Sequence, residues 1–179
     1  MRRIVHLIWS LVFAMTIANG STGAQDLENT LYLDTAHGRV VIELRPDIAP
    51  KHVERIKELT REGFYDGIVF HRVIEDFMAQ TGDPTGTGRG GSDKPDLPAE
   101  FSSTAKFERG TLGMARSQSP DSANSQFFIN FAATPFLDGQ YTIWGQVVEG
   151  MEHVDQIARG EPPASPDTIV KMQVAADAS

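Results

Sequence analysis

Short strand-like segments, separated by turns rich in glycine, proline and aspartate, are the feature that most limits the fold of this chain. Residues 31–35 and 40–44 are rich in β-branched and alternating side chains around Gly38, a pattern typical of a β-hairpin. Similar segments recur along the rest of the chain. They predict six further strands, at residues 68–74, 77–81, 111–115, 126–131, 141–148 and 169–174.

Two segments far apart in the sequence have helical periodicity instead. Residues 50–63 begin with a proline and end with a glycine, as helices often do. Between them, apolar side chains recur at the spacing of one helix face. These are Val53, Ile56 and Leu59, with the later Phe64 on the same side. Residues 149–158 show a second, shorter helical pattern before Gly160.

Many short strands, two separated helices and no internal repeat predict a mainly β protein. We expect a closed eight-stranded antiparallel β-barrel capped by two α-helices, because closure removes the edge strands that a free sheet exposes. A β-sandwich is the alternative. The barrel is favoured because two helices can cover its two open ends, an arrangement that is harder to build on a sandwich.

The first 24 residues have the composition of a signal peptide. Two arginines precede residues 4–18, which are mostly apolar and contain no acidic side chain, and small residues follow. Cleavage after Gly20 or Ala24 would satisfy the small-residue rule, and Ala24 is preferred. Residues 25–179 would then form a single mature domain, exported to the periplasm or secreted.

Two other interpretations of this segment are open. A membrane span needs roughly 20 apolar residues, and the apolar run here is shorter. Arg2-Arg3 is compatible with a twin-arginine signal, but the residues that follow do not strengthen that interpretation. Ordinary secretion is the default, with no membrane attachment after cleavage.

Charge and cysteine content exclude several classes of function. The formal net charge of −8 disfavours a nucleic-acid binder, which normally carries a basic patch, and also disfavours docking to an anionic membrane. The chain has no cysteine. Disulfides, thiol nucleophiles and thiolate metal sites are therefore excluded.

An arginine lies among apolar residues in the predicted strand 68–74. Strand alternation would place Phe70, Arg72 and Ile74 on one face. A guanidinium among large apolar side chains is costly unless it reaches water or a partner. Arg72 is therefore either a functional side chain or an ordinary arginine in a surface ion pair.

His71, next to this arginine, invites a hydrolytic interpretation. It could act as a base with Ser125 or Asp83, but its sequence context matches no hydrolase motif. On a regular strand it would also point away from Arg72. We expect a buried, hydrogen-bonded structural histidine.

Metal and phosphate sites are also disfavoured. The remaining candidate ligands, His37, His52 and His153, lack the spacing of a metal motif. The glycine-rich residues 85–91 lack the lysine and the following helix of a phosphate-binding loop. Residues 82–98 are expected to form a long loop.

Three long motifs resemble one known family. They are FHRVIEDFMAQTGDPTGTGRGG, GMARSQSPDSANSQFFIN and FLDGQYTIWGQVVEGMEHVDQI, at residues 70–91, 113–130 and 136–157. In this order and separation they resemble the cyclophilins, and the resemblance extends over nearly all of residues 30–174. It implies a helix-capped β-barrel, in agreement with the strand pattern. It also implies a peptidyl-prolyl cis-trans isomerase that needs no cofactor and acts on proline-containing peptides and unfolded or partly folded proteins, as an expected monomer.

The resemblance also implies site residues. The family's active-site arginine corresponds to Arg72, and its carbonyl-binding glutamine to Gln80. Ala115 corresponds to a backbone contact, and Gln126 to a second glutamine at the pocket edge. The pocket and its rim correspond to Phe77, Met78, Phe128 and Leu137, with Phe136 and Tyr141 at the rim.

The sequence departs from the family pattern at four positions. Phe136 replaces the tryptophan of many eukaryotic members, so an indole donor is missing and binding of cyclosporin-like macrocycles is expected to weaken. Tyr141 replaces a histidine. Arg116 replaces an asparagine that acts through its backbone carbonyl, which should survive. Asp76 replaces a turn glycine and should tolerate a left-handed conformation at small cost.

A module that binds proline-containing peptides with little turnover is the rival function. It would use the same apolar pocket residues. Such a binder could dispense with Arg72, so the complete set of residues favours the enzyme.

Overall fold

The computed structural model describes residues 26–178, so the predicted signal peptide lies outside the described residues. Eight strands and two α-helices are present, as the sequence predicts. The strands are β1 (Thr30–Thr35), β2 (Gly38–Leu44), β3 (Arg72–Ile74), β4 (Met78–Thr81), β5 (Thr111–Met114), β6 (Phe127–Asn130), β7 (Ile143–Glu149) and β8 (Lys171–Val174). The helices are α1 (Pro50–Arg61) and α2 (Met151–Val154), with single 3-10 turns at Leu27–Asn29, Pro135–Leu137 and Ala175–Asp177.

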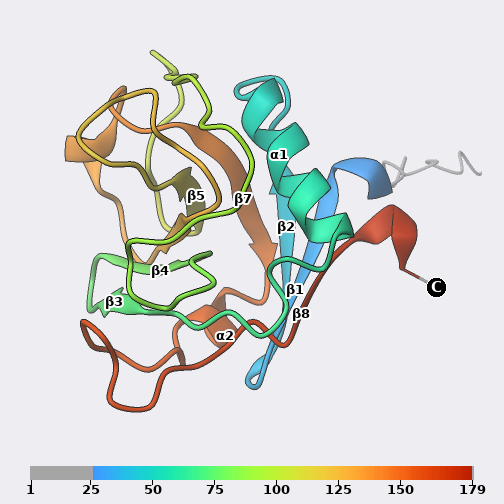
Figure 1. The fold of residues 1–179 in the computed structure, drawn as a ribbon, viewed down its shortest axis with the longest axis vertical. Helices are drawn as coiled ribbons and strands as arrows, with labels where there is room; N and C mark the ends of the chain where they lie inside the picture. The colour runs from blue at the N-terminus through green and yellow to red at the C-terminus, as the bar shows by residue number, and fades with distance from the viewer. Residues whose placement is uncertain (1–25, 179) are drawn as a thin grey trace, which may run out of the picture.

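All eight strands belong to one antiparallel sheet in the order β3-β4-β6-β5-β7-β2-β1-β8. The sheet curls on itself, and α1 and α2 lie toward its opposite ends (Figure 1). A barrel of one sheet therefore replaces the sandwich alternative. None of the helices within residues 26–178 has the length and apolar character needed to cross a membrane.

The barrel closes less regularly than predicted. The terminal strands β3 and β8 are not paired with each other along their length. Instead, the segments that precede them are joined by backbone hydrogen bonds, from Phe70 N–H to Asp167 C=O (2.8 Å) and from Ile169 N–H to Ile68 C=O (2.9 Å). The barrel is therefore less completely closed than predicted, although the number and direction of its strands are confirmed.

Two predicted segments are shorter in the structure. The helical pattern of residues 149–158 forms a helix only over Met151–Val154, and turns follow it. The strand predicted at residues 68–74 is regular only over Arg72–Ile74, because the preceding residues bond to the segment before β8. Phe70 is consequently buried in the main core rather than on the face of Arg72, so the prediction that they share a face is wrong.

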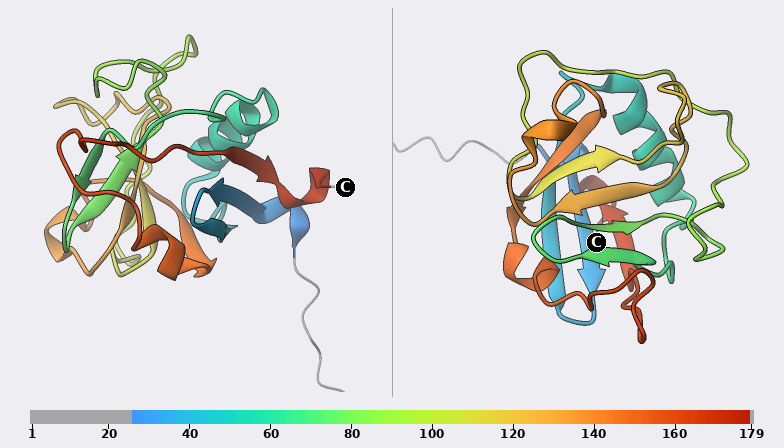
Figure 2. Two further views of the ribbon diagram at one scale, coloured as in Figure 1. Left: turned by 90° about the horizontal axis from the view of Figure 1, so that it is seen from below. Right: turned by 90° about the vertical axis from the view of Figure 1, so that its left-hand side faces the viewer.

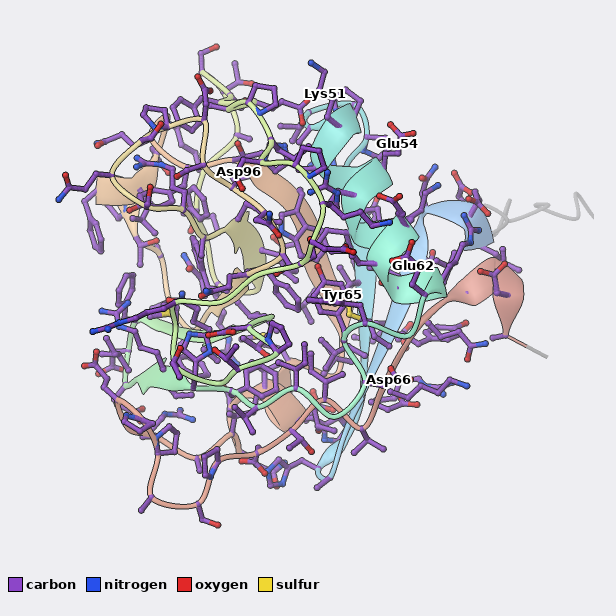
Figure 3. All side chains as sticks on the ribbon, in the orientation of Figure 1. Lys51, Glu54, Glu62, Tyr65, Asp66 and Asp96 are labelled. Atoms are coloured by element: carbon purple, nitrogen blue, oxygen red, sulfur yellow. The ribbon has the colours of Figure 1, made fainter. Side chains whose placement is uncertain are left out.

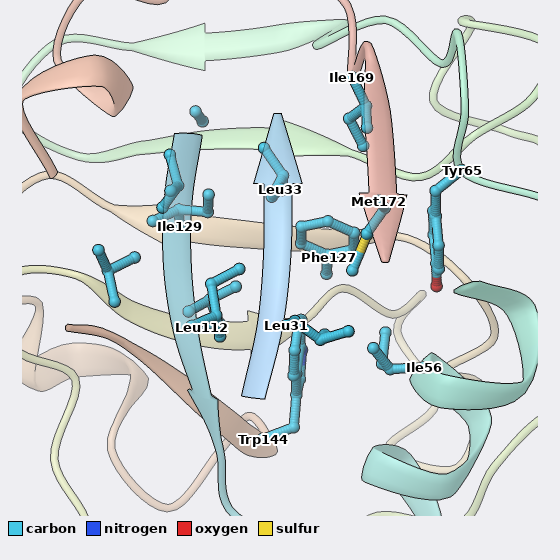
Figure 4. Close-up of a cluster of buried hydrophobic side chains, with 14 of the residues drawn as sticks. Leu31, Leu33, Ile56, Tyr65, Leu112, Phe127, Ile129, Trp144, Ile169 and Met172 are labelled. Carbon is cyan, nitrogen blue, oxygen red and sulfur yellow. The ribbon is translucent and has the colours of Figure 1, made fainter. Parts of the chain in front are cut away.

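The main core fills the space between the sheet and α1 (Figure 4). Leu31, Phe127 and Trp144 are fully buried within it, and the Phe127 ring packs edge-on against the Trp144 ring at a centroid distance of 5.3 Å. Burying side chains of this size contributes roughly 1.5–3 kcal/mol each. This core holds the strands whose outer faces carry the candidate site.

Helix α1 presents the predicted apolar face to the core. Val53, Ile56 and Leu59 are buried, while Lys51 and Glu54 are exposed on the far side of the helix (Figure 3). Its N-terminus has no side-chain cap of its own, because Ala49 precedes Pro50.

Glu100, from a distant loop, takes over the capping of α1. Its carboxylate accepts hydrogen bonds from the backbone N–H groups of Lys51 (3.2 Å) and His52 (3.0 Å). It also lies 2.6 Å from Nδ1 of the buried His52 ring. The loop that contains Glu100 is thereby attached to the N-terminus of α1.

Candidate active site

A row of paired residues crosses four strands on the outer face of the barrel. Arg72 on β3 lies opposite Gln80 on β4, Gln80 lies opposite Phe128 on β6, and Phe128 lies opposite Gly113 on β5. Residues that are paired across antiparallel strands point to the same face. The row therefore brings together residues that are up to 56 positions apart in the chain. Figure 2 (right) shows the four strands side by side.

A second apolar cluster lies beneath this row, separate from the main core. Met78, Phe107, Phe128, Leu137 and Ile143 form its buried part. The Phe128 and Phe107 rings stack at a centroid distance of 5.7 Å. Gly113 leaves room for them, because a Cβ at this position would meet the Phe128 ring and would lie 2.6 Å from the Phe107 ring.

The cluster and the row border a cavity of about 140 Å³ that is open to the surface. That is much smaller than the roughly 300–1,000 Å³ of pockets for drug-sized ligands, and it suits one small side chain. The cavity is lined by Arg72, Phe77, Met78, Gln80, Ala115, Arg116, Phe128, Leu137 and Tyr141. Eight of these nine residues are among the ten predicted from the sequence.

The two other predicted residues lie beside the cavity. Gln126 lines a neighbouring hollow of about 400 Å³. Phe136 is largely exposed at the rim, where its ring packs on that of Phe77 at a centroid distance of 5.6 Å. The structure thus brings all ten residues into one region, with Gln126 and Phe136 outside the cavity wall.

Arg72 takes part in an ion pair at the edge of the cavity. Its Nε donates a hydrogen bond of 2.8 Å to Oε2 of Glu161, and the Arg72 side chain is 42% exposed. The surface ion pair considered in the sequence analysis is therefore present, and the same guanidinium also lines the cavity. No sequence pattern pointed to Glu161, which lies 89 residues away.

The two glutamines form a chain of hydrogen bonds along the cavity edge. Gln80 Nε2 donates to Gln126 Oε1 (2.9 Å), and Gln126 Nε2 donates to the carbonyl of Gly90 (2.8 Å). The Gln80 amide is held in one orientation as a result. A primary amide has two N–H donors, so one of them is left for a ligand.

Arg116 is the cavity residue that the predicted site set omitted. Its guanidinium donates to the carbonyls of Gln140 (2.9 Å) and Ser117 (2.9 Å), and it lies over the Tyr141 ring, 4.4 Å from the centroid. It lines both the cavity and the larger hollow. The family resemblance implied only a backbone contact at this position, next to Ala115 in the second motif.

His71 is not part of a hydrolytic arrangement. Ser125 Oγ donates to the carbonyl of Gly82 (2.7 Å) rather than to an imidazole. The His71 ring is buried, and among the described residues neither ring nitrogen has a hydrogen-bond partner. The expected burial is confirmed, but the expected hydrogen bond is absent. Burial lowers the pKa of His71, which favours the neutral ring.

The glycine-rich loop binds a carboxylate of its own chain. Asp83 is fully buried and accepts hydrogen bonds from the backbone N–H groups of Thr85 (2.8 Å), Thr87 (3.1 Å) and Gly90 (3.1 Å). The Asp83 carboxylate thus uses the backbone donors that a phosphate would need. Residues 82–98 contain no helix or strand, which confirms the predicted loop. Burial alone would raise the pKa of Asp83, but the hydrogen bonds outweigh it and lower the pKa to about 2.

The three histidines considered as metal ligands each contact a different group. His37 contacts Asp167 (3.1 Å), His52 contacts Glu100 (2.6 Å), and His153 packs beneath Gly38. Within residues 26–178, no group of three or more His, Cys, Asp or Glu side chains could hold a metal ion.

The small cavity combines apolar walls from Met78, Phe128 and Leu137 with amide and guanidinium donors from Gln80 and Arg72. The fold and the site therefore define a helix-capped antiparallel β-barrel with a small pocket, edged by hydrogen-bond donors, on its outer face. Comparison with known proteins makes the assignment specific. The family described as cyclophilin type peptidyl-prolyl cis-trans isomerase/CLD matches residues 30–174. The chain belongs to this family and is an isomerase of its type.

Individual relatives agree. A probable peptidyl-prolyl cis-trans isomerase from Brucella suis is 53% identical over 173 residues, covering 88% of each chain. Peptidyl-prolyl cis-trans isomerase-like 1 from Homo sapiens is 44% identical over 134 residues, covering 73% of this chain and 80% of the relative.

Solved structures share the fold. The cyclophilin AquaCyp293 from Hirschia baltica superimposes with a TM-score of 0.79 at 30% identity, covering 86% of this chain and 76% of the other. A Cryptosporidium parvum cyclophilin crystallised in the presence of the dipeptide Ala-Pro gives a TM-score of 0.76 at 30% identity, covering 81% and 98%.

Proposed function

We propose that the chain rotates X–Pro bonds by seating the proline ring in the 140 Å³ cavity, with Arg72 donating a hydrogen bond to the prolyl nitrogen. The observation that supports this most strongly is the row of Arg72, Gln80 and Phe128 in register across three strands. A donor, an amide and an aromatic wall are thereby held on rigid elements beside one cavity.

The chemistry of the bond explains why a donor at nitrogen is useful. The X–Pro bond resists rotation by roughly 18–20 kcal/mol because the nitrogen lone pair is delocalised into the carbonyl. In the twisted transition state the lone pair is localised on nitrogen and accepts a hydrogen bond. A donor aimed there stabilises the transition state far more than the planar ground state, which lowers the barrier. No covalent bond forms and no proton is transferred.

Arg72 suits this role among the side chains around the cavity. Its guanidinium is always charged and planar, and its donors are arranged in a rigid fork. Its Nε already bonds to Glu161, so the two terminal nitrogens remain for the substrate. The free N–H of Gln80 would hold the carbonyl on one side of the bond while the other side rotates.

The hydrogen bond and the burial of the ring account for much of the required lowering of the barrier, and desolvation of the amide and retention of the twisted form must supply the remainder. An acceleration of about 10⁵ requires roughly 7 kcal/mol. One preorganised donor contributes about 3–4 kcal/mol. Burial of the proline ring between Phe77, Met78, Phe128 and Leu137 holds the bond in a dry site and contributes roughly 1.5–3 kcal/mol.

Proline-containing peptides and partly folded proteins are the proposed substrates, acted on by a monomer. The Ala-Pro dipeptide used with the Cryptosporidium relative supports a proline ligand. Cyclosporin-like macrocycles should bind weakly, because Phe136 offers no N–H donor at the rim.

A protease-coupled assay on a proline-containing tetrapeptide separates the enzyme from a peptide-binding module. In this assay the uncatalysed isomerisation of the X–Pro bond appears as a slow phase of cleavage that lasts tens to hundreds of seconds. An enzyme should abolish this slow phase. A chain that binds the peptide but leaves the slow phase unchanged would be a binding module instead.

We also propose that the chain is exported and cleaved after Ala24. The basic start and apolar run of the first 24 residues support this. Removal of Arg2 and Arg3 would change the formal net charge from −8 to −10. Fractionation followed by N-terminal sequencing should find Gln25 as the first residue in the periplasm or medium. A chain that begins at Met1 in the cytoplasm would contradict the proposal.

A further inference from the structure

Glu161 is the protein partner of the Arg72 guanidinium. The Nε–Oε2 distance is 2.8 Å, and the side chains are 42% and 54% exposed. Among the described residues, the terminal nitrogens of Arg72 donate to no protein acceptor. An ion pair of this exposure contributes little to stability, so its effect on the position of the guanidinium is the more informative property.

The backbone holds Glu161 beside Arg72. Val73 and Gly160, the neighbours of the two charged residues, exchange a pair of backbone hydrogen bonds, each 2.8 Å long. Gly160 cannot be replaced without strain, because its φ is +148° and a Cβ would lie 2.5 Å from Cα of Pro163. The carboxylate is therefore presented to Arg72 by a short bridge and not by a freely moving loop.

Arg72 lies between two hollows of the surface. Arg72 lines both the proline-sized cavity and a separate hollow that also contains Glu161 and Pro162. Glu161 does not line the proline-sized cavity. Because the guanidinium is planar and rigid, the bond from Nε to Glu161 restricts its rotation and leaves the N–H groups of the two terminal nitrogens without a protein acceptor among the described residues.

A second ion pair flanks the same bridge with the charges reversed. Arg159, before Gly160, donates through Nε to Glu75, which follows β3. The Glu75 side chain is 66% exposed, and neither member of this pair lines the cavity. The molecule thus contains a matched ion pair, on the same backbone bridge, that does not involve the candidate catalytic arginine.

We propose that Glu161 is a positioning residue, which holds the Arg72 guanidinium with its terminal donors toward the prolyl nitrogen. The proposal rests on the isomerase mechanism above. Because Glu161 acts through Arg72 and does not touch the substrate, it should affect the transition state more than peptide binding. Its loss should therefore lower kcat and leave KM nearly unchanged.

The test compares four variants of the whole chain: Glu161→Gln, Glu161→Ala, Glu75→Gln and Glu75→Ala. We expect kcat to fall by about two- to fivefold in both Glu161 variants, the range given by exposed ion pairs. Both Glu75 variants should retain the wild-type kcat and KM. All four should lose similar, small amounts of stability, so stability cannot explain the difference.

An NMR signature reports on the guanidinium itself. The Nε–H correlation of Arg72, assigned by its disappearance in Arg72→Lys, should shift and exchange faster with water in Glu161→Gln, but not in Glu75→Gln. Equal kcat in the Glu161 and Glu75 variants would overturn the proposal while the isomerase mechanism stands. A higher kcat in Glu161→Gln would also overturn it, because Glu161 would then draw Arg72 away from the substrate. The mechanism itself would be overturned by different results, namely an inactive wild-type chain or a folded Arg72→Ala variant with near wild-type activity.

Discussion

Single residues determine the shape and polarity of the candidate site. Gly113 has no side chain, and the space beside it is occupied by the rings of Phe107 and Phe128. Phe128 in turn forms one wall of the cavity. Because Gly113 on β5 has no Cβ, the Phe128 ring can lie close to this strand, and the cavity beside the ring stays open.

Replacing Gly113 with alanine should close the cavity. The new Cβ would push the Phe128 ring outward, and overpacking of this kind costs about 1–3 kcal/mol of stability. We expect kcat/KM to fall by about tenfold, which corresponds to about 1.4 kcal/mol. Gly145→Ala on β7 is the control, because its Cβ would crowd Ile42 (3.1 Å) in the main core. Its kcat/KM should stay near wild type, and an equal loss in both variants would contradict the explanation.

At the residue scale, the sequence predicts which residues lie at the site better than it predicts the contacts they make. Asp76 does adopt the left-handed conformation expected for it, with a φ of 57°. Arg72 lines the cavity as expected, but its pairing with Glu161 was not predictable, because the contact depends on the Val73–Gly160 bridge between distant segments.

At the scale of elements, the loop of residues 82–98 is held by the buried carboxylate of Asp83. Three backbone N–H groups and the Thr85 hydroxyl point toward it. The pKa of Asp83 is lowered from 3.8 to about 2, so the folded state binds its proton less readily than the unfolded state. Its stabilisation is therefore present above about pH 4 and is lost as the pH falls through about 2.

Asp83→Asn should remove this stabilisation. We expect the free energy of unfolding at pH 7 to decrease by about 2 kcal/mol, and the decrease in stability between pH 4 and 2 to become smaller. Chemical denaturation at several pH values measures both. Asp47→Asn is the control, since Asp47 pairs with Arg45 at the surface, where ion pairs contribute about 0–1 kcal/mol. Unchanged stability of Asp83→Asn at pH 7 would contradict the role given to the carboxylate.

The sequence located most elements but not all of their ends. Helix α1 follows from its apolar spacing, because that spacing is a local property. Helix α2 ends at Val154, earlier than its pattern suggests, and β3 begins only at Arg72. The start of β3 depends on hydrogen bonds between distant segments, such as Phe70 to Asp167, which no local pattern contains. After α2, the chain continues in turns with hydrogen bonds such as Ile157 N–H to Val154 C=O.

At the scale of the whole molecule, the two faces of the curled sheet have different roles. Its inner face holds the main core, and its outer face across β3, β4, β6 and β5 carries the second apolar cluster and the cavity. Side chains alternate along each strand, so one set of strands serves both stability and substrate binding. The barrel architecture was predictable from the strand pattern, whereas its irregular closure depends on segments outside the regular strands.

The measurement that tests the central claim most directly is the isomerase activity of Arg72→Ala, with Arg159→Ala as the control arginine beyond Gly160. Loss of one preorganised donor should lower kcat/KM by about 10²–10³-fold, and Arg72→Lys should also be poor because an ammonium lacks the guanidinium fork. Arg159→Ala should retain activity, and circular dichroism should show every variant folded. A folded Arg72→Ala variant with near wild-type kcat/KM would contradict the account.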